Sequence, residues 1–324
     1  MRPAMRGRWG HCNMRAKIRL VVALSAGSLG PLLCAARGAE ASSPWLPPRG
    51  EAIVRVKLLA HETDRAFCPT EFSESSPGLC GDGDRVRYPL EGRARDRGVL
   101  CEAEVGVAER ASLDARLTYY DLRFDDLLTL RRSRGLGDLT LGGRVALLRG
   151  RARAAPFAAV KIPLADESIA PGILAIGDQQ IDVETGLHAG GAFGSAFAAA
   201  RAGYRFRARN DATGRQPGDE AFFALDLGAR AGRVLLRCGF DRLAGEETTV
   251  DSVAAAGSLA GATRRVEPGK SVTRVSPGVL VAVSASAEIE IGALIPLAGR
   301  NYPASATFVV GISRRFRLWR ERGA

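Results

Sequence analysis

Residues 135–164 read GLGDLTLGGRVALLRGRARAAPFAAVKIPL, and apolar and polar side chains alternate here on both sides of a tight turn. Before the turn, Leu139, Leu141 and Val145 fall on one face of an extended chain, and Val160 continues the pattern after it. Alternation over about ten residues exceeds the ordinary strand of roughly five or six residues. It matches the 9–11 tilted residues with which a β-strand crosses a membrane. The stretch therefore predicts two membrane-spanning β-strands.

The N-terminus has the pattern of a secretory signal peptide over residues 1–41. A short basic start at 14–19 precedes an apolar core at 20–33, and Ala39-Glu40-Ala41 is a small-x-small cleavage site. Met1 and Met14 both remain possible starts. A membrane anchor is the first alternative, but the apolar run is too short and is broken by Gly and Pro. A lipoprotein modified at Cys34 is the second, but Leu33 before it is not the small residue that processing prefers.

Charge and hydropathy narrow the class of protein. The formal net charge of the 324 residues is +11, and removal of residues 1–41 leaves +5. This excess is small and scattered, so we expect no nucleic-acid partner. No later stretch holds 18 consecutive apolar residues, which excludes a membrane-spanning helix. An exported chain of long alternating strands instead predicts an outer-membrane barrel.

The alternation repeats along the chain, and the joins between strands alternate in length. Beyond the opening pair, strands are predicted at 52–60, 99–108, 112–122, 178–189, 194–207, 219–230, 233–241, 275–284, 287–296 and 304–316. Short joins are expected near 109–111, 149–152, 190–193, 231–232 and 285–286, and longer ones at 61–98, 123–137, 165–177, 208–218, 242–274 and 297–303. Bacterial outer-membrane barrels have an even number of strands, short periplasmic turns and long outer loops.

The fold predicted is therefore all-β: a single antiparallel, up-and-down transmembrane β-barrel of about 12 strands over residues 52–316. Residues 42–51 form an irregular periplasmic tail or a plug, and 317–324 a C-terminal extension. A water-soluble β-sandwich or solenoid is the alternative, but sandwich strands are shorter and do not require this alternation of joins. With 12 strands the lumen should be narrow, since eight-stranded barrels are filled and 16-stranded porins are open.

Several short motifs, in order, resemble the family of outer-membrane transporters associated with the MetA pathway of phenol degradation. The matching stretches are Gly135–Gly142, Phe157–Leu164, Ile176–Asp182, Pro217–Glu220, Pro296–Asn301 and Val310–Phe316. This resemblance implies a β-barrel that takes up small apolar or aromatic molecules. Two features depart from the family: the chain continues eight residues past Phe316, and the first long loop carries cysteines.

The polar faces of the strands predict the side chains that line the lumen. Acidic and basic residues alternate from strand to strand, which suits either a structural lattice of ion pairs or a charged constriction that selects solutes. Hairpin geometry is expected to set Asp226 opposite Arg237 and Glu104 opposite Arg116. The lumen-facing candidates are Glu104, Arg116, Arg144, Lys161, Asp182, Glu184, Arg201, Arg205, Asp226, Arg233, Arg237, Glu288 and Glu290.

Four cysteines follow the predicted signal peptide: Cys68, Cys80, Cys101 and Cys238. An even number in an oxidising compartment predicts disulfides near the outer rim, with three pairings open. No CxxC motif or paired histidine accompanies them, so we expect no metal or other cofactor. His61 and His188 are the only histidines after the signal, and no nucleophile–base spacing accompanies them. We therefore expect no enzyme.

The leading functional hypothesis is a channel for passive uptake of small solutes, apolar or aromatic ones among them, in the outer membrane of a Gram-negative bacterium. The expected partners are outer-membrane lipid, a small-molecule solute and the barrel-assembly machinery. The alternative is a barrel without a transport role whose outer loops 61–98 and 242–274 bind a partner or a surface polymer.

Overall fold

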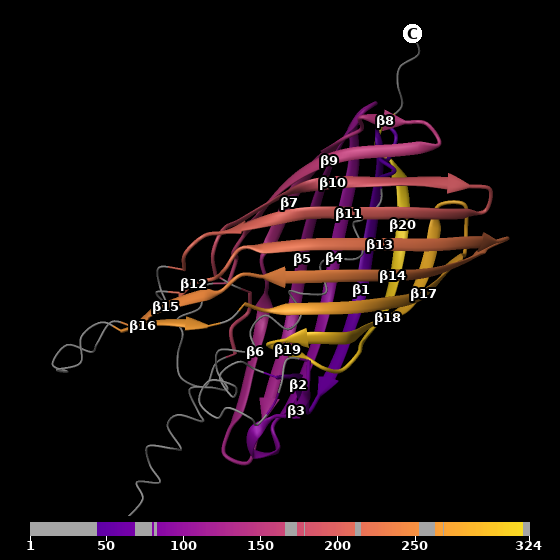
Figure 1. Ribbon diagram of the computed structural model, residues 1–324. Helices are drawn as coiled ribbons and strands as arrows, with labels where there is room; N and C mark the ends of the chain where they lie inside the picture. The colour runs from indigo at the N-terminus through magenta and orange to yellow at the C-terminus, as the bar shows by residue number, and fades with distance from the viewer. Residues whose placement is uncertain are drawn as a thin grey trace, which may run out of the picture.

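The computed structural model describes residues 44–68, 80, 83–165, 174–177, 179–210, 215–252, 263–267 and 269–319. The predicted signal peptide, the first two residues of the tail and the last five residues of the C-terminal extension lie outside these ranges. Over the described residues the chain forms a closed, antiparallel barrel of 12 strands, as predicted (Figure 1). Closure occurs between β9 and β10, and β1 pairs with β20.

The wall strands follow one another in chain order around the barrel. They are β1 (Glu51–Thr63), β4 (Arg93–Ala108), β5 (Ala111–Asp125), β7 (Leu139–Val145), β9 (Ala152–Ile162), β10 (Asp182–Phe193), β11 (Ala196–Arg207), β13 (Glu220–Ala231), β14 (Val234–Gly245), β17 (Ser271–Ala282), β18 (Ala287–Arg300) and β20 (Thr307–Arg317). Glu51 pairs with Arg317, so the wall begins and ends at the same rim, which also carries the short turns.

Several strand ends differ from the prediction, most clearly in the charged segment 123–137. This segment was expected to be a loop, but β6 (Leu130–Leu136) continues the hairpin with β5 and leaves only residues 126–129 as a turn. Cross-strand ion pairs explain the difference, because Asp121 on β5 holds Arg132 and Arg134 on β6 at 3.0 and 2.9 Å. Ion pairs between polar residues on neighbouring strands can thus extend a hairpin beyond the part of the wall whose outward face must be apolar. The join predicted at 190–193 is likewise the end of β10.

The two faces of the wall follow the alternation in the sequence. Large apolar side chains face outward around the barrel, including Val56, Leu58, Leu113, Leu141, Leu187, Leu236, Val279, Ile291 and Val310. Their neighbours along each strand point into the lumen and are mostly buried. Within the described ranges, no helix is both long and apolar enough to span a bilayer.

Short elements cover the rim opposite the short turns. One small sheet joins β2 (Arg65–Phe67), β3 (Arg85–Arg87) and β19 (Tyr302–Pro303), next to the 3-10 turn η2 (Pro89–Glu91), and another joins β12 (Arg215–Gln216), β15 (Thr248–Ser252) and β16 (Thr263–Glu267). Strand β8 (Leu148–Arg149) extends the β9 edge at the short-turn rim. We call the covered end the long-loop end (Figure 1).

One disulfide is present among the described residues, between Cys68 and Cys80 in the first long loop. The expectation that Cys101 and Cys238 also lie near the rim is wrong. Cys101 pairs across β4 with Val56 and Leu117, and Cys238 pairs across β14 with Leu227, so both lie mid-strand. Both are free and exposed on the outward face, because their positions in the alternation are those of the apolar residues.

Candidate functional site

A belt of alternating charges crosses one half of the lumen. Lys57 on β1 lies at its centre, with Nζ 3.6 Å from Glu102 of β4 and 3.3 Å from Glu290 of β18. Arg237 of β14 continues the series at 3.5 Å from Glu290 and 3.0 Å from Asp226 of β13. The full sequence of contacts runs through Arg116, Glu102, Lys57, Glu290, Arg237 and Asp226, and it holds three positive and three negative charges.

A second group of charges occupies the other half of the wall. Glu184 of β10 accepts hydrogen bonds from Arg201 at 2.8 Å and from Arg205 at 2.6 Å, both on β11. Arg205 also binds Glu220 of β13, and Arg207 donates to the same carboxylate at 3.1 Å. A guanidinium group that binds carboxylates in this way fixes the orientation of the side chains and balances their charges.

The second group ends in a buried lysine between two carboxylates. Nζ of Lys161 on β9 lies 2.6 Å from Asp182 and 3.4 Å from Asp138, and all three side chains are almost inaccessible. Arg207 reaches Asp182 at 3.7 Å and so joins this triad to the arginines of β11. We call both groups together, with the Arg144–Glu104 pair, the charged belt.

Most of the predicted lumen candidates lie in the belt. Glu288 lies near the short-turn rim, where it accepts a hydrogen bond from Arg230 at 2.8 Å. Arg233 does not line the lumen: it is exposed in the turn between β13 and β14, because Ala231 pairs with Val234 and the turn residues are 232 and 233.

Two of the expected strand registers differ from those in the structure. Asp226 pairs with Gly239, and Arg237 reaches it diagonally, since the strands are offset by two residues from the expected register. On β4 and β5, Glu104 pairs with Asp114, and Arg116 instead stands opposite Glu102. A bulge near Gly106 shifts this hairpin.

Above the Lys57 half of the belt, toward the long-loop end, the lumen contains a cluster of apolar side chains that we call the apolar compartment. Leu59 lies two residues beyond Lys57 on β1, and Leu100 lies two residues beyond Glu102 on β4. The compartment comprises Leu59, Ala94, Leu100, Tyr120, Leu122, Phe124, Leu174, Ile176, Leu294 and Val309. Residues 174–177 of the β9–β10 loop thus pack inward, where the backbone N–H of Leu174 donates to the Ser133 hydroxyl at 2.9 Å.

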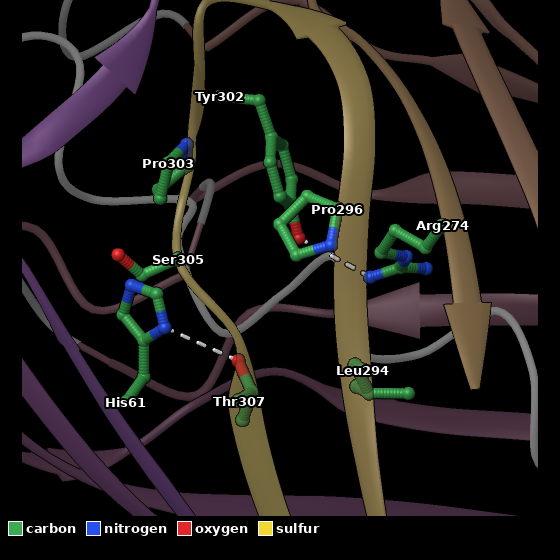
Figure 2. A pocket seen from close by; sticks show the side chains of 8 residues that line it. All are labelled: His61, Arg274, Leu294, Pro296, Tyr302, Pro303, Ser305 and Thr307. Atoms are coloured by element: carbon green, nitrogen blue, oxygen red, sulfur yellow. Dashed lines mark hydrogen bonds between the residues drawn. The ribbon is translucent and has the colours of Figure 1, made fainter. Parts of the chain in front are cut away.

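A small recess borders the compartment on the β18–β20 side (Figure 2). Leu294 lines it from the apolar side, and Nδ1 of His61 lies 3.3 Å from the hydroxyl of Thr307. Arg274 donates to the Tyr302 hydroxyl at 3.2 Å, on the other side of Pro296 (Figure 2). Arg274 is also held by Asp241 at 2.7 Å, so its charge is neutralised.

The N-terminal tail, residues 44–50, lies across the short-turn opening of the lumen. Pro44 packs against Gly190 of β10, and the ring of Trp45 meets Phe197 of β11 edge-on at 5.8 Å. At the other side of the opening, the Gly50 N–H donates to the carbonyl of Gly106 on β4 at 2.8 Å. Three wall strands separate β4 from β10, so the tail crosses the part of the opening beside β5, β7 and β9.

Several side chains of the site were not predicted from the sequence, and they differ in how clearly the apolar–polar alternation marks them. Lys57 alternates with Val56 and Leu58 in a clear strand pattern and could have been assigned to the lumen. Asp138 lies at the break between β6 and β7, where alternation stops, so no periodicity places it. The packing of the tail depends on contacts distant in sequence, which no local pattern reveals.

In the part of the chain that the structure describes, Tyr88, which lies outside the strands, has a pKa well above its ordinary value. Burial, followed by the nearby carboxylates of Asp96 and Asp64, raises the pKa of Tyr88, since all three disfavour the phenolate. Tyr88 packs edge-on against Phe124 at 5.7 Å and closes the apolar compartment from the loop side. No group of three or more His, Cys, Asp or Glu side chains in the described part of the chain could hold a metal ion.

Comparison with known proteins supports the architecture. No family model and no curated protein sequence matches the chain. The structure is similar to that of the COG4313 outer membrane channel from Pseudomonas putida F1, with a TM-score of 0.61 and 14% identity over 83% of this chain and 97% of that one.

Two monoaromatic hydrocarbon channels also align. A deltaS2 mutant of TodX has a TM-score of 0.44 and 10% identity, covering 83% of this chain and 91% of that one. CymD has a TM-score of 0.40 and 10% identity, covering 85% and 90%. The similarity to the first channel shows a shared fold, and the scores of the other two are too low to support an argument.

Proposed function

We propose that this protein is an outer-membrane channel for the passive uptake of small apolar solutes. The observation that supports the proposal most directly is the apolar compartment, because it lines one side of the long-loop half of the lumen with side chains such as Leu100, Leu122 and Phe124. Water and ions gain nothing from such a lining, whereas an apolar or aromatic solute is stabilised there by burial of roughly 25 cal/mol per Å².

The outward face of the barrel supports the membrane location. Exposed Val, Leu and Ile side chains surround the wall, as bilayer-facing strands require. The long-loop end then faces the outside, since bacterial barrels place long loops outward and short turns in the periplasm. Solutes would meet the apolar compartment together with the Lys161 half of the charged belt, then the Lys57 half, and finally the N-terminal tail. Passage requires the packed side chains and the tail to move apart.

Uptake measurements test the proposal. Cells that express the full-length protein should accumulate radiolabelled toluene faster than cells without it, while liposome swelling in a small sugar should remain slow. Leu122→Ser in the apolar compartment should reduce toluene uptake several-fold, because it removes apolar contact and places a hydroxyl in the path. Leu243→Ser, in the separate apolar cluster on β14, is the matched control.

Two results would contradict the proposal. Equal toluene uptake with and without a correctly folded wild-type protein would favour the alternative, a barrel whose outer loops bind a partner. Fast sugar flux would instead indicate a porin for polar solutes. Heat-modifiable gel mobility establishes that each variant is folded.

A further inference from the structure

The outward face of the β4–β5–β6 region carries a dense group of arginines immediately beyond the apolar band. On β5 the outward side chains from Leu113 to Tyr119 are apolar or aromatic, and the next outward position, two residues further along, is charged. We call the arginine surface the set Arg93, Arg95 and Arg97 on β4, Arg123 on β5, and Arg132 and Arg134 on β6. Only Glu62, Asp121 and Asp125 balance these six arginines on the same surface, which leaves a net charge of +3.

The register places like charges directly side by side. Arg95 pairs with Arg123 across β4 and β5, and Arg123 pairs with Arg132 across β5 and β6. Adjacent like charges in a sheet are destabilising on their own. The carboxylates leave an excess of guanidinium groups: Asp121 is shared by Arg132 and Arg134, Glu62 is shared by Arg93 and Arg95, and Arg123 pairs with Asp125 at 3.6 Å. Three guanidinium groups in a row therefore favour an anion between them.

The arginines are accessible to such an anion. The side chains of Arg95, Arg123 and Arg132 are 41%, 43% and 50% exposed, and all three point away from the lumen. Neighbouring strands lie roughly 4.8 Å apart, so adjacent guanidinium groups can hold one phosphate between them through paired N–H donors. Arg97, in the row nearest the apolar band, forms no ion pair with any residue in the described ranges.

The position of the surface indicates the source of the phosphate. The row just below contains Leu58, Val99, Tyr119 and Leu136, which belong to the apolar band. A phosphate held by the arginines would therefore lie at the level where acyl chains end and headgroups begin. The corresponding ends of β11 and β13 carry Tyr204, Phe206 and Phe223 outward, so the arginine surface is a local feature of one side.

We propose that the arginine surface binds the phosphate groups of a phosphorylated glycolipid in the outer leaflet, such as lipid A. The proposal rests on the proposed outer-membrane location but not on transport. Its consequence is an oriented barrel: the lipid would anchor the β5–β6 hairpin, which projects at the lower end of the molecule (Figure 1), against the headgroup layer.

Native mass spectrometry of the full chain in detergent micelles, with EDTA present to remove bridging cations, tests the proposal. The probes are lipid A with two phosphates, the same lipid after dephosphorylation, and inorganic phosphate. The wild type should retain lipid A at least tenfold more tightly than the dephosphorylated lipid. The triple variant Arg95→Gln, Arg123→Gln, Arg132→Gln should lose most of this preference, and Arg123→Gln alone should lose a smaller part if the triple variant does not fold.

The matched control is Arg314→Gln, Arg315→Gln, Arg317→Gln, which removes three exposed arginines at the short-turn end. This variant should keep the wild-type preference. Equal losses in both triple variants would overturn the proposal, because they would indicate a general charge effect. Equal binding of phosphorylated and dephosphorylated lipid would also overturn it, as would competition by micromolar inorganic phosphate, which would assign the surface to a free anion. None of these results depends on solute uptake.

Discussion

Gly106 offers a way to move the N-terminal tail without altering the tail itself. A Cβ atom at this position would overlap the carbonyl oxygens of Pro47 and Pro48, and its nearest neighbours all belong to the tail. The substitution Gly106→Ala therefore leaves the wall intact and acts on the tail alone. We expect it to displace residues 44–50 from the opening.

The magnitude follows from what holds the tail. The edge-on pair of Trp45 and Phe197 contributes about 0.5–1.5 kcal/mol, and Arg153, at 6.0 Å from the Trp45 ring, adds about 0.5–1 kcal/mol. Overpacking by one methyl group costs roughly 1–3 kcal/mol, which is about the size of these two contacts together. Since 1.4 kcal/mol is a factor of ten, the ratio of docked to undocked tails should fall by roughly 5- to 140-fold.

Single-channel recording of the purified protein measures the effect as the fraction of time spent conducting, and limited proteolysis measures it as cleavage within the tail. Both should rise in Gly106→Ala. The control is Gly278→Ala, also in the lumen, where the nearest atom to a new Cβ is the Ile291 carbonyl oxygen at an ordinary 3.5 Å. A folded Gly106→Ala protein with wild-type conduction and protection would refute the reasoning.

Three further predictions concern the wall. Arg237→Gln should shift ion selectivity toward cations in planar bilayers at low salt, because it leaves the belt with an excess negative charge; screening should abolish the shift near 1 M salt. Lys161→Met should lower the free energy of unfolding by about 3–5 kcal/mol in urea titrations, because it strands two buried carboxylates, and neutralising both partners should restore stability. Alkylation without reduction, followed by mass spectrometry, should modify Cys101 and Cys238 but not the cysteines of the disulfide.

The alternation of side chains predicted the barrel and its strand number because every wall strand must separate bilayer from lumen. Where a strand no longer has to separate bilayer from lumen, the prediction of strand ends failed. Segment 123–137 lacks apolar alternation and was expected to be a loop, yet ion pairs from Asp121 extend the strands there. Register failed for a related reason: a shift of two residues keeps every side chain on its face, so the pattern cannot distinguish Arg237 opposite Asp226 from Arg237 opposite Gly228.

Charge balance in the belt connects the lumen to the kind of solute. The sequence predicted acidic and basic residues that alternate from strand to strand, and the structure pairs them across the lumen, so that the two halves of the belt hold three and four charges of each sign. Unit charges 4 Å apart interact by about 4 kcal/mol at an effective dielectric constant of 20, so a permeating ion would have to compete with pairs already formed. An uncharged solute disturbs none of them. Under the proposed function, the neutral belt and the apolar compartment act in the same direction: both disfavour ions relative to uncharged solutes, and neither opposes a small apolar molecule once the tail has moved.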